Sequence, residues 1–300
     1  MTEKTFLVKK PKWLRRRVPT EAIAQLQNKL ASEGLKTVCE LAACPNIGEC
    51  FRHQQATFMI LGDSCTRNCK FCNVQSQKPE KINPFEADRL AKRAKIMAIK
   101  YLVITSPTRD DLKDGGANHY LHVSKRLVEE IPELKLELLV PDFRNSQKTA
   151  LRILNEAQVA VFGHNIETTY SLHNKISPQG DYRISLKLLE LQKNLFPEIP
   201  TKSGLIVGLG EERTDLELTI KDLQLAGISI LTIGQYLQPR PDLWQVKKYY
   251  RSEEFHELKD FALSLGIEEV LAGTFVRSSY RARESFESLK KKNPILHDSE

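Results

Sequence analysis

Residues 57–72 read TFMILGDSCTRNCKFC, in which a short apolar run passes directly into a loop that carries three cysteines. The run over residues 57–62 is typical of a buried strand. After it, the thiols of Cys65, Cys69 and Cys72 follow at C-x3-C-x2-C spacing. The stretch therefore predicts a strand whose carboxyl end delivers three sulfur ligands into one loop.

Further apolar runs predict strands at residues 101–106, 135–140, 159–164, 203–208 and 229–235. Helical spacing of apolar residues predicts helices at residues 84–99, 117–131, 146–156, 182–195, 214–226 and 253–265. Strands that alternate with helices imply right-handed βαβ units and a parallel sheet. Six units are too few for an eight-stranded barrel, so we expect an α/β fold, a partial (β/α)6 TIM-type barrel. An open doubly wound sheet is the alternative. In both architectures the chemistry belongs at the carboxyl ends of the strands.

Two segments lie outside this core. Residues 1–52 form an N-terminal arm with three further cysteines, residues 53–270 form the barrel, and residues 271–300 form a C-terminal arm. We expect both arms to extend the barrel rather than to fold as separate domains.

Composition narrows the class of protein. The 45 Lys and Arg residues against 38 Asp and Glu give a formal charge of +7, which is too small an excess to indicate nucleic-acid binding. No run approaches the ~20 apolar residues of a membrane span, and the charged start does not resemble a signal peptide. We therefore expect a cytoplasmic protein. Its six cysteines then indicate metal or redox chemistry rather than a disulfide framework.

The thiols of Cys65, Cys69 and Cys72 can hold three corners of a cubane 4Fe–4S cluster. The fourth iron would have no protein ligand and could bind a cofactor through an amine and a carboxylate. A structural zinc site is the alternative, but zinc takes four ligands and usually receives them in pairs from separate segments. A cluster is the better interpretation.

This spacing, on the loop after the first strand of a barrel, resembles the radical S-adenosylmethionine superfamily, and Phe71 before the last cysteine matches as well. The resemblance implies that Cys65, Cys69 and Cys72 are catalytic. Their cluster would give one electron to S-adenosylmethionine, which breaks into methionine and a 5′-deoxyadenosyl radical. That radical abstracts hydrogen from unactivated carbon.

A second group, Cys39, Cys44 and Cys50, lies upstream at C-x4-C-x5-C spacing. One cubane takes four ligands and the first loop already supplies three, so the six thiols divide naturally into three and three. From the residues alone, a second cluster is only somewhat favoured over a zinc knuckle.

Eight segments are together similar to the lipoyl synthase family, in the order of that family: residues 11–19, 37–51, 62–72, 105–120, 162–169, 202–211, 233–239 and 275–282. The resemblance implies two 4Fe–4S clusters and S-adenosylmethionine as cofactors. It also implies insertion of two sulfur atoms at C6 and C8 of a protein-bound octanoyl-lysine, which forms lipoyl-lysine. The second cluster would be the sulfur donor, held by Cys39, Cys44, Cys50 and a serine, with Ser279 preferred to Ser278.

The same resemblance implies partners. The substrate would be an octanoylated lipoyl-carrier domain, of a 2-oxoacid dehydrogenase E2 subunit or of the glycine cleavage H protein. A reductant such as ferredoxin or flavodoxin would supply electrons. A biotin synthase-like enzyme and a zinc-bound interaction protein are the alternatives.

The chemistry agrees with this assignment, because no side chain can deprotonate an unactivated C–H bond, so sulfur insertion requires hydrogen-atom abstraction first. The carbon radical then needs sulfur already in place. We hypothesise that a serine hydroxyl leaves its iron more readily than a thiolate, which suits a cluster that is consumed.

Several residues are candidates for contact with S-adenosylmethionine. Asn165 and Glu167 follow the fourth strand and could bind the ribose or the amino group, although capping of the next helix is an equal structural role. Arg183 could pair with the methionine carboxylate or be an ordinary surface arginine. After the second strand, Thr105 and Ser106 are better candidates than Arg109 and Asp110.

Two stretches depart from the family pattern. Residues 239–244 read PRPDLW where we expect a Pro-Thr-type turn and a histidine, and Pro107 and Thr108 replace a common valine and acidic residue. Both flank the expected mouth of the site, so they bear on the choice of carrier.

Overall fold

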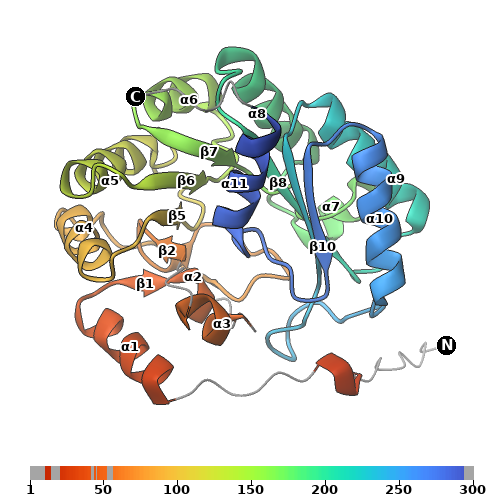
Figure 1. Cartoon of the computed structure of the whole chain (residues 1–300). Helices are drawn as coiled ribbons and strands as arrows, with labels where there is room; N and C mark the ends of the chain where they lie inside the picture. Colours follow the sequence, from red (N-terminus) through yellow and green to blue (C-terminus); the bar gives the residue numbers. More distant parts are fainter. Residues whose placement is uncertain (1–10, 15–20, 42–43, 45, 53–56, 294–300) are drawn as a thin grey trace.

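The structure, a computed structural model, describes residues 11–14, 21–41, 44, 46–52 and 57–293. One sheet of eight strands dominates it (Figure 1). In spatial order its strands are β1 (Lys36–Thr37), β2 (Thr57–Met59), β5 (Tyr101–Thr105), β6 (Lys135–Leu139), β7 (Val159–Gly163), β8 (Thr201–Val207), β9 (Ile230–Gln235) and β10 (Glu269–Gly273). Neighbouring strands are parallel except β1, which pairs with β2 in antiparallel orientation. β1 and β10 are the two end strands of this order and do not pair with each other. The barrel is therefore not closed, and the sheet forms the expected partial barrel.

Helices cover the outer face of the sheet, as the sequence predicts to within a few residues. They are α4 (Glu86–Ile96), α5 (Ala117–Glu130), α6 (Gln147–Asn155), α8 (Tyr182–Leu195), α9 (Arg213–Leu225) and α10 (Ser252–Ser264). The N-terminal arm contributes η1 (Lys12–Leu14), α1 (Glu21–Ser32), α2 (Val38–Leu41) and α3 (Ile47–Arg52). A ribbon of β3 (Ser64–Cys65) and β4 (Gln75–Ser76) holds the cysteine loop.

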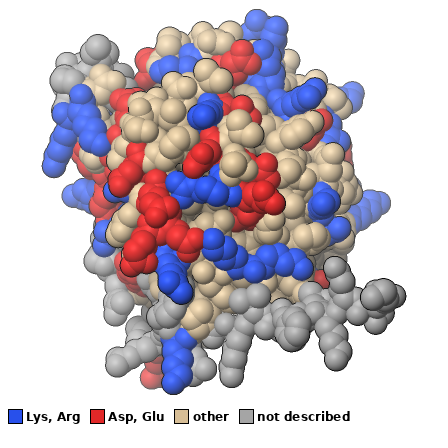
Figure 2. All heavy atoms as spheres, turned by 90° about the vertical axis from the view of Figure 1, so that its right-hand side faces the viewer, with Lys and Arg blue, Asp and Glu red and all other residues tan. Residues whose placement is uncertain are grey.

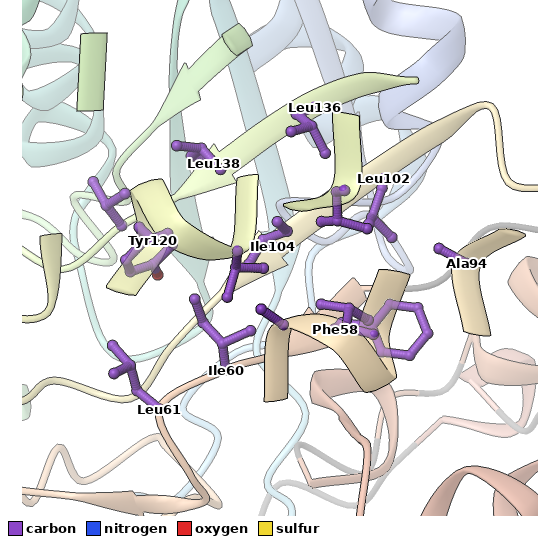
Figure 3. Close-up of a cluster of buried hydrophobic side chains, with 14 of the residues drawn as sticks. Phe58, Ile60, Leu61, Ala94, Leu102, Ile104, Tyr120, Leu136 and Leu138 are labelled. Carbon is purple, nitrogen blue, oxygen red and sulfur yellow. The ribbon is translucent and has the colours of Figure 1, made fainter. Parts of the chain in front are cut away.

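Strand residues alternate between two apolar environments. Every second side chain of β2, β5 and β6 packs outward under the helices, including Phe58, Ile104 and Leu138 (Figure 3). The intervening residues, such as Thr57, Tyr101 and Val103, line the inside of the barrel. Because both faces are buried, β2 and β5 read as continuous apolar runs, whereas β6 interrupts its run with the buried Glu137.

The C-terminal segment does more than extend the barrel. We expected an arm from residue 271, but Glu269–Gly273 forms β10, a further parallel strand beside β9. After it, α11 (Ala282–Lys292) packs Phe286 and Leu289 against Tyr101 and Ile230, the first residues of β5 and β9. In Figure 1, α11 lies across the middle of the barrel. It therefore closes the barrel at the amino ends of the strands.

Short α7 (Tyr170–Ile176) also lies outside the sequence-based expectation; it connects β7 to the turn before α8. None of the helices within the described residues has the length and apolar character needed to cross a bilayer.

Candidate metal centres

The first cysteine loop sits at the carboxyl end of β2. Pairing continues one residue past β2, where the Ile60 amide donates to the Thr105 carbonyl at 2.9 Å, and the chain then turns into the loop. The Cys72 amide donates to the Cys69 carbonyl at 3.1 Å, which folds the loop back on itself. The three half-buried thiols of the loop are close enough to influence one another's ionisation.

The electrostatics of this loop fit an iron cluster. Burial, followed by the neighbouring thiols, raises the pKa of Cys72 to about 12, and burial raises that of Cys69 to about 11. Thiolates here therefore need a compensating positive charge, which iron supplies. The Tyr236 hydroxyl is buried near Cys72 and has no hydrogen-bond partner among the described residues. A polar or charged group bound at the thiols would relieve both the cost of burying thiolates and the cost of leaving the Tyr236 hydroxyl without a partner.

Arg67, inside the loop, anchors it to the barrel. The buried guanidinium donates to both oxygens of Asp142, at 2.6 and 2.7 Å, and to both oxygens of Asp110, at 2.7 and 2.8 Å. Burial opposes ionisation of Asp142, but Arg67 holds its pKa below the usual value. Nothing in the sequence distinguished Arg67 from the loop's other polar residues.

The loop after β9 also contacts the cysteine loop. The Trp244 amide donates to the Lys70 carbonyl at 2.8 Å, and its indole donates to the Leu209 carbonyl at 2.8 Å. Phe71 packs against an apolar cluster that includes Tyr236 and Val246. The stretch that departs from the family pattern therefore touches the cysteine loop directly.

Glu167 lies at the rim beside these thiols. Burial raises its pKa to about 7, although Asn165 Nδ2 donates to its carboxylate at 3.1 Å. The Glu167 charge in turn raises the pKa of Cys69 and of Cys72, which places the three groups together. The N-cap residue of α7 is Thr169. Neither Asn165 nor Glu167 therefore caps this helix, which was the alternative to contact with the cofactor.

The other candidates are placed differently. The hydroxyls of Thr105 and Ser106 lie at the carboxyl end of β5, beside the hydroxyl of Tyr120. Arg183 is exposed at the start of α8, with its guanidinium 5.8 Å from the Tyr170 ring centroid. Arg109 and Asp110 have structural partners, the Leu61 carbonyl for Arg109 and the Arg67 guanidinium for Asp110.

The second cysteine group lines a small cavity that is partly open to solvent. Cys39, Cys44, Cys50 and Ser279 all line it, beside the first residues of β2 and β5. Burial, then the charges of Cys44 and Cys50, raises the pKa of Cys39 to about 12. Here too a buried polar atom, Asn46 Oδ1, has no partner among the described residues. The donor set, three thiols and one hydroxyl, suits a cubane cluster.

The C-terminal arm reaches this cavity through the inside of the barrel. The Thr57 hydroxyl donates to Ser279 Oγ at 2.7 Å, and the Tyr280 hydroxyl donates to Glu49 at 2.8 Å. Ser278 instead accepts a 2.7 Å hydrogen bond from Asn165. The adjacent serines therefore face different sites, and only Ser279 lines the cavity.

Two glycines on the inner face of the barrel make room for the arm. A Cβ on Gly204 would lie 2.6 Å from Asn165 Oδ1 and 3.1 Å from Ser278 Oγ. A Cβ on Gly234 would collide with the Val276 carbonyl. A side chain at Gly234 would displace the backbone of the arm, whereas one at Gly204 would displace the Asn165 amide beside Ser278.

Within the described residues, no three His, Cys, Asp or Glu side chains converge as a site for a single metal ion.

Comparisons with known proteins agree with the cluster chemistry. The Radical SAM superfamily matches residues 59–223. Lipoyl synthases of Salmonella arizonae and Salmonella paratyphi B are 45% identical over 284 residues, which cover 94% of this chain and 88% of each relative.

Solved structures share the fold at low identity. A methylornithine synthase matches with a TM-score of 0.54 at 14% identity, over 90% of this chain and 92% of its own. The FeFe-hydrogenase maturase HydG of Carboxydothermus hydrogenoformans matches with a TM-score of 0.55 at 13% identity, over 90% and 69%. The extent of the sequence match decides the narrower assignment: the chain belongs to the lipoyl synthase family of the radical SAM superfamily.

Proposed function

We propose that this enzyme is a lipoyl synthase that inserts two sulfur atoms, at C6 and C8 of a protein-bound octanoyl-lysine. Its cofactors are S-adenosylmethionine and two 4Fe–4S clusters. The observation that carries the proposal is the separation of the thiols into two groups, one with Ser279 in its wall. A chain with only the C-x3-C-x2-C cysteines would instead have favoured a biotin synthase-like enzyme.

In this proposal Cys65, Cys69 and Cys72 hold the cluster that binds S-adenosylmethionine. When bound, that cluster supplies the electron that generates a radical able to remove hydrogen from an unactivated carbon. The chain's own part is to hold three thiols in one loop, through the contacts of Arg67 and Trp244, and to exclude water with the apolar cluster around Phe71.

Glu167 and Asn165 would bind the cofactor's polar groups. A carboxylate with a pKa of about 7 is ionised above neutrality and can then accept a hydrogen bond from the amino group of the methionine moiety. Asn165 fixes the carboxylate by its 3.1 Å hydrogen bond. Thr105 and Ser106 would contribute from the neighbouring strand end. For Arg183, its exposure favours the surface role over contact with the carboxylate.

Cys39, Cys44, Cys50 and Ser279 would hold the cluster that provides sulfur. Ser279 Oγ accepts from Thr57 in this structure, so its own proton and a lone pair remain for other partners. Loss of the proton would make it an oxygen ligand to iron. This arrangement supports Ser279 over Ser278 as the fourth ligand.

The substrate of a lipoyl synthase is a lipoyl-carrier protein, and we propose the E2 subunit of a 2-oxoacid dehydrogenase or the glycine cleavage H protein. Ferredoxin or flavodoxin is the proposed reductant, and the cytoplasm the proposed location. Acidic and basic side chains intermingle on the face in Figure 2. The formal charge of +7 is therefore not concentrated on this face.

Anaerobic reconstitution with iron and sulfide tests the proposal. We expect a brown protein with about eight irons per chain. Incubated with S-adenosylmethionine, dithionite and an octanoyl-lysyl peptide, it should yield 5′-deoxyadenosine and a peptide with two added sulfur atoms by mass spectrometry. A colourless protein with stoichiometric zinc, or no 5′-deoxyadenosine, would refute the proposal.

A further inference from the structure

A serine hydroxyl lies against one thiol of the first cysteine loop. Ser177, buried just after α7, has its Oγ 3.1 Å from Cys69 Sγ. The other two sulfurs of the loop receive backbone donors: the Arg67 amide lies 3.4 Å from Cys65 Sγ, and the Val74 amide reaches Cys72. Among the contacts of the described residues, Cys69 is thus the thiol of this loop with a side-chain donor.

Chemistry fixes the direction of this hydrogen bond when Cys69 binds iron. A ligating thiolate has no proton, so the Ser177 hydroxyl must be the donor. Hydrogen bonds to cluster sulfurs help to set reduction potentials. A donor stabilises the more negative, reduced form more than the oxidised form, so it raises the potential.

Backbone contacts hold the two side chains together. The Lys70 amide donates to the Ile176 carbonyl at 2.8 Å, which joins the cysteine loop to the residue before Ser177. The Ser177 amide donates to the His173 carbonyl at 2.7 Å, and the Gly180 amide closes the turn on the Ser177 carbonyl at 2.9 Å. The contact between Ser177 and Cys69 is therefore built into the fold on both sides.

Gly180 leaves the space that the hydroxyl occupies. A Cβ at position 180 would lie 2.6 Å from Ser177 Oγ, too close for any real contact. A side chain there would turn the hydroxyl away from Cys69 while leaving Ser177 itself intact.

We propose that Ser177 is a positioning residue whose hydroxyl raises the reduction potential of the cluster at Cys65, Cys69 and Cys72 by donating to Cys69 Sγ. This rests on the proposed function, which assigns the cluster to these thiols. Ser177 eases the delivery of an electron to that cluster without touching the substrate.

The test is an anaerobic redox titration of the reconstituted full chain, followed by electron paramagnetic resonance. The relevant signal is the one that shifts when S-adenosylmethionine is added, because only an open iron can bind it. Ser177→Ala should shift the ratio of oxidised to reduced cluster about tenfold toward the oxidised form. For one electron, this corresponds to a reduction potential about 59 mV more negative. Ser177→Thr, which keeps a hydroxyl, should stay close to the unaltered enzyme.

Ser171→Ala is the matched control. It removes a hydroxyl from α7, the helix that leads into Ser177, but that hydroxyl donates to Asp215 at 2.6 Å and not to sulfur. We expect its potential to be unchanged. Gly180→Ala should lower the potential as Ser177→Ala does, and it decides the matter if Ser177→Ala takes up no cluster.

An unchanged reduction potential in Ser177→Ala would overturn this inference alone, since the cluster would still be seen. If Ser177→Ala takes up no cluster, an unchanged potential in Gly180→Ala would do the same. Equal shifts in Ser171→Ala would overturn it as well, because they would report a general disturbance of α7. Failure of the unaltered chain to form any cluster that responds to S-adenosylmethionine would instead overturn the proposed function, and this inference with it.

Discussion

Thr57 Oγ1 donates a 2.7 Å hydrogen bond to Ser279 Oγ, although 222 residues separate them in the sequence. Thr57 is the first residue of β2, whose other end leads into the first cysteine loop. The neighbouring Ser278 accepts from Asn165, which also donates to Glu167. Two adjacent serines thus contact the walls of the two proposed cluster sites.

Ser279→Ala and Ser278→Ala should therefore have different effects. We expect Ser279→Ala to reduce sulfur insertion at least about tenfold, the scale seen when a metal site loses a supporting group, while 5′-deoxyadenosine still forms. Ser278→Ala should keep the iron content and weaken S-adenosylmethionine binding, because Asn165 loses a partner. Iron analysis and product quantification distinguish the two. The reverse pattern would make Ser278 the ligand.

Ser279→Cys tests why an oxygen ligand is used. If a hydroxyl is there because it leaves iron readily, a thiolate should retain the cluster and stop or slow sulfur insertion. Full sulfur insertion with normal loss of the cluster would show that lability of the ligand is the wrong explanation.

The sequence predicted the barrel because its strands are buried on both faces, which leaves continuous apolar runs such as residues 101–106. It missed β10, whose residues are mostly half-buried, and α11, which is rich in charge and packs through a few residues such as Phe286 and Leu289. Short elements with little apolar surface give weak periodicity.

The spacing of the cysteines predicted them as ligands, but nothing in the sequence predicted their polar partners. Arg67 and Ser177 reach their partners only through the fold, Asp142 lying 75 residues from Arg67 and Cys69 lying 108 residues from Ser177. Spacing along the chain carries no signal for such contacts. The same holds for Gly204 and Gly234, whose role depends on where the C-terminal arm runs.

Removing one thiol from each group should separate the two halves of the reaction. Cys72→Ala should abolish 5′-deoxyadenosine formation, because the cluster that binds S-adenosylmethionine loses a ligand. Cys39→Ala should still cleave S-adenosylmethionine but add no sulfur to the octanoyl-lysyl peptide. Mass spectrometry of both products is the measurement. Sulfur insertion by Cys39→Ala at the unaltered level would contradict a second cluster as the sulfur source.

Binding of S-adenosylmethionine should weaken as pH falls through about 7, the value to which burial raises the pKa of Glu167. Below it the carboxyl is protonated and loses the charge that strengthens its hydrogen bond from the cofactor's amino group, so affinity should fall by up to about tenfold per pH unit. The dissociation constant, measured from about pH 8 to about pH 6, checks this. Glu167→Gln should bind weakly and without this dependence; a parallel slope in Glu167→Gln would exclude Glu167 as its source.

The same pKa has the opposite consequence for folding of the cluster-free chain. Because the folded pKa exceeds the usual 4.5, the native state holds a proton that the unfolded state releases between about pH 4.5 and about pH 7. Glu167 should therefore cost stability progressively as pH rises through this window. Urea unfolding should show a shallower loss over it in Glu167→Gln; identical pH profiles would contradict the shift.

Arg67→Ala should destabilise the chain by about 3 to 5 kcal/mol, because it leaves the Asp142 carboxylate, 3% exposed, buried without its cation. Asp110→Asn is the matched control: its side chain is 40% exposed, and water can replace much of the lost interaction, so the expected cost is about 0 to 1 kcal/mol. Urea unfolding of the cluster-free chains measures both.

If the ion pair with Asp142 is the main anchor of the cysteine loop, Asp142→Asn should also load less iron than Asp110→Asn. Equal losses in the two variants would mean that the exposed carboxylate anchors the loop as firmly as the buried one.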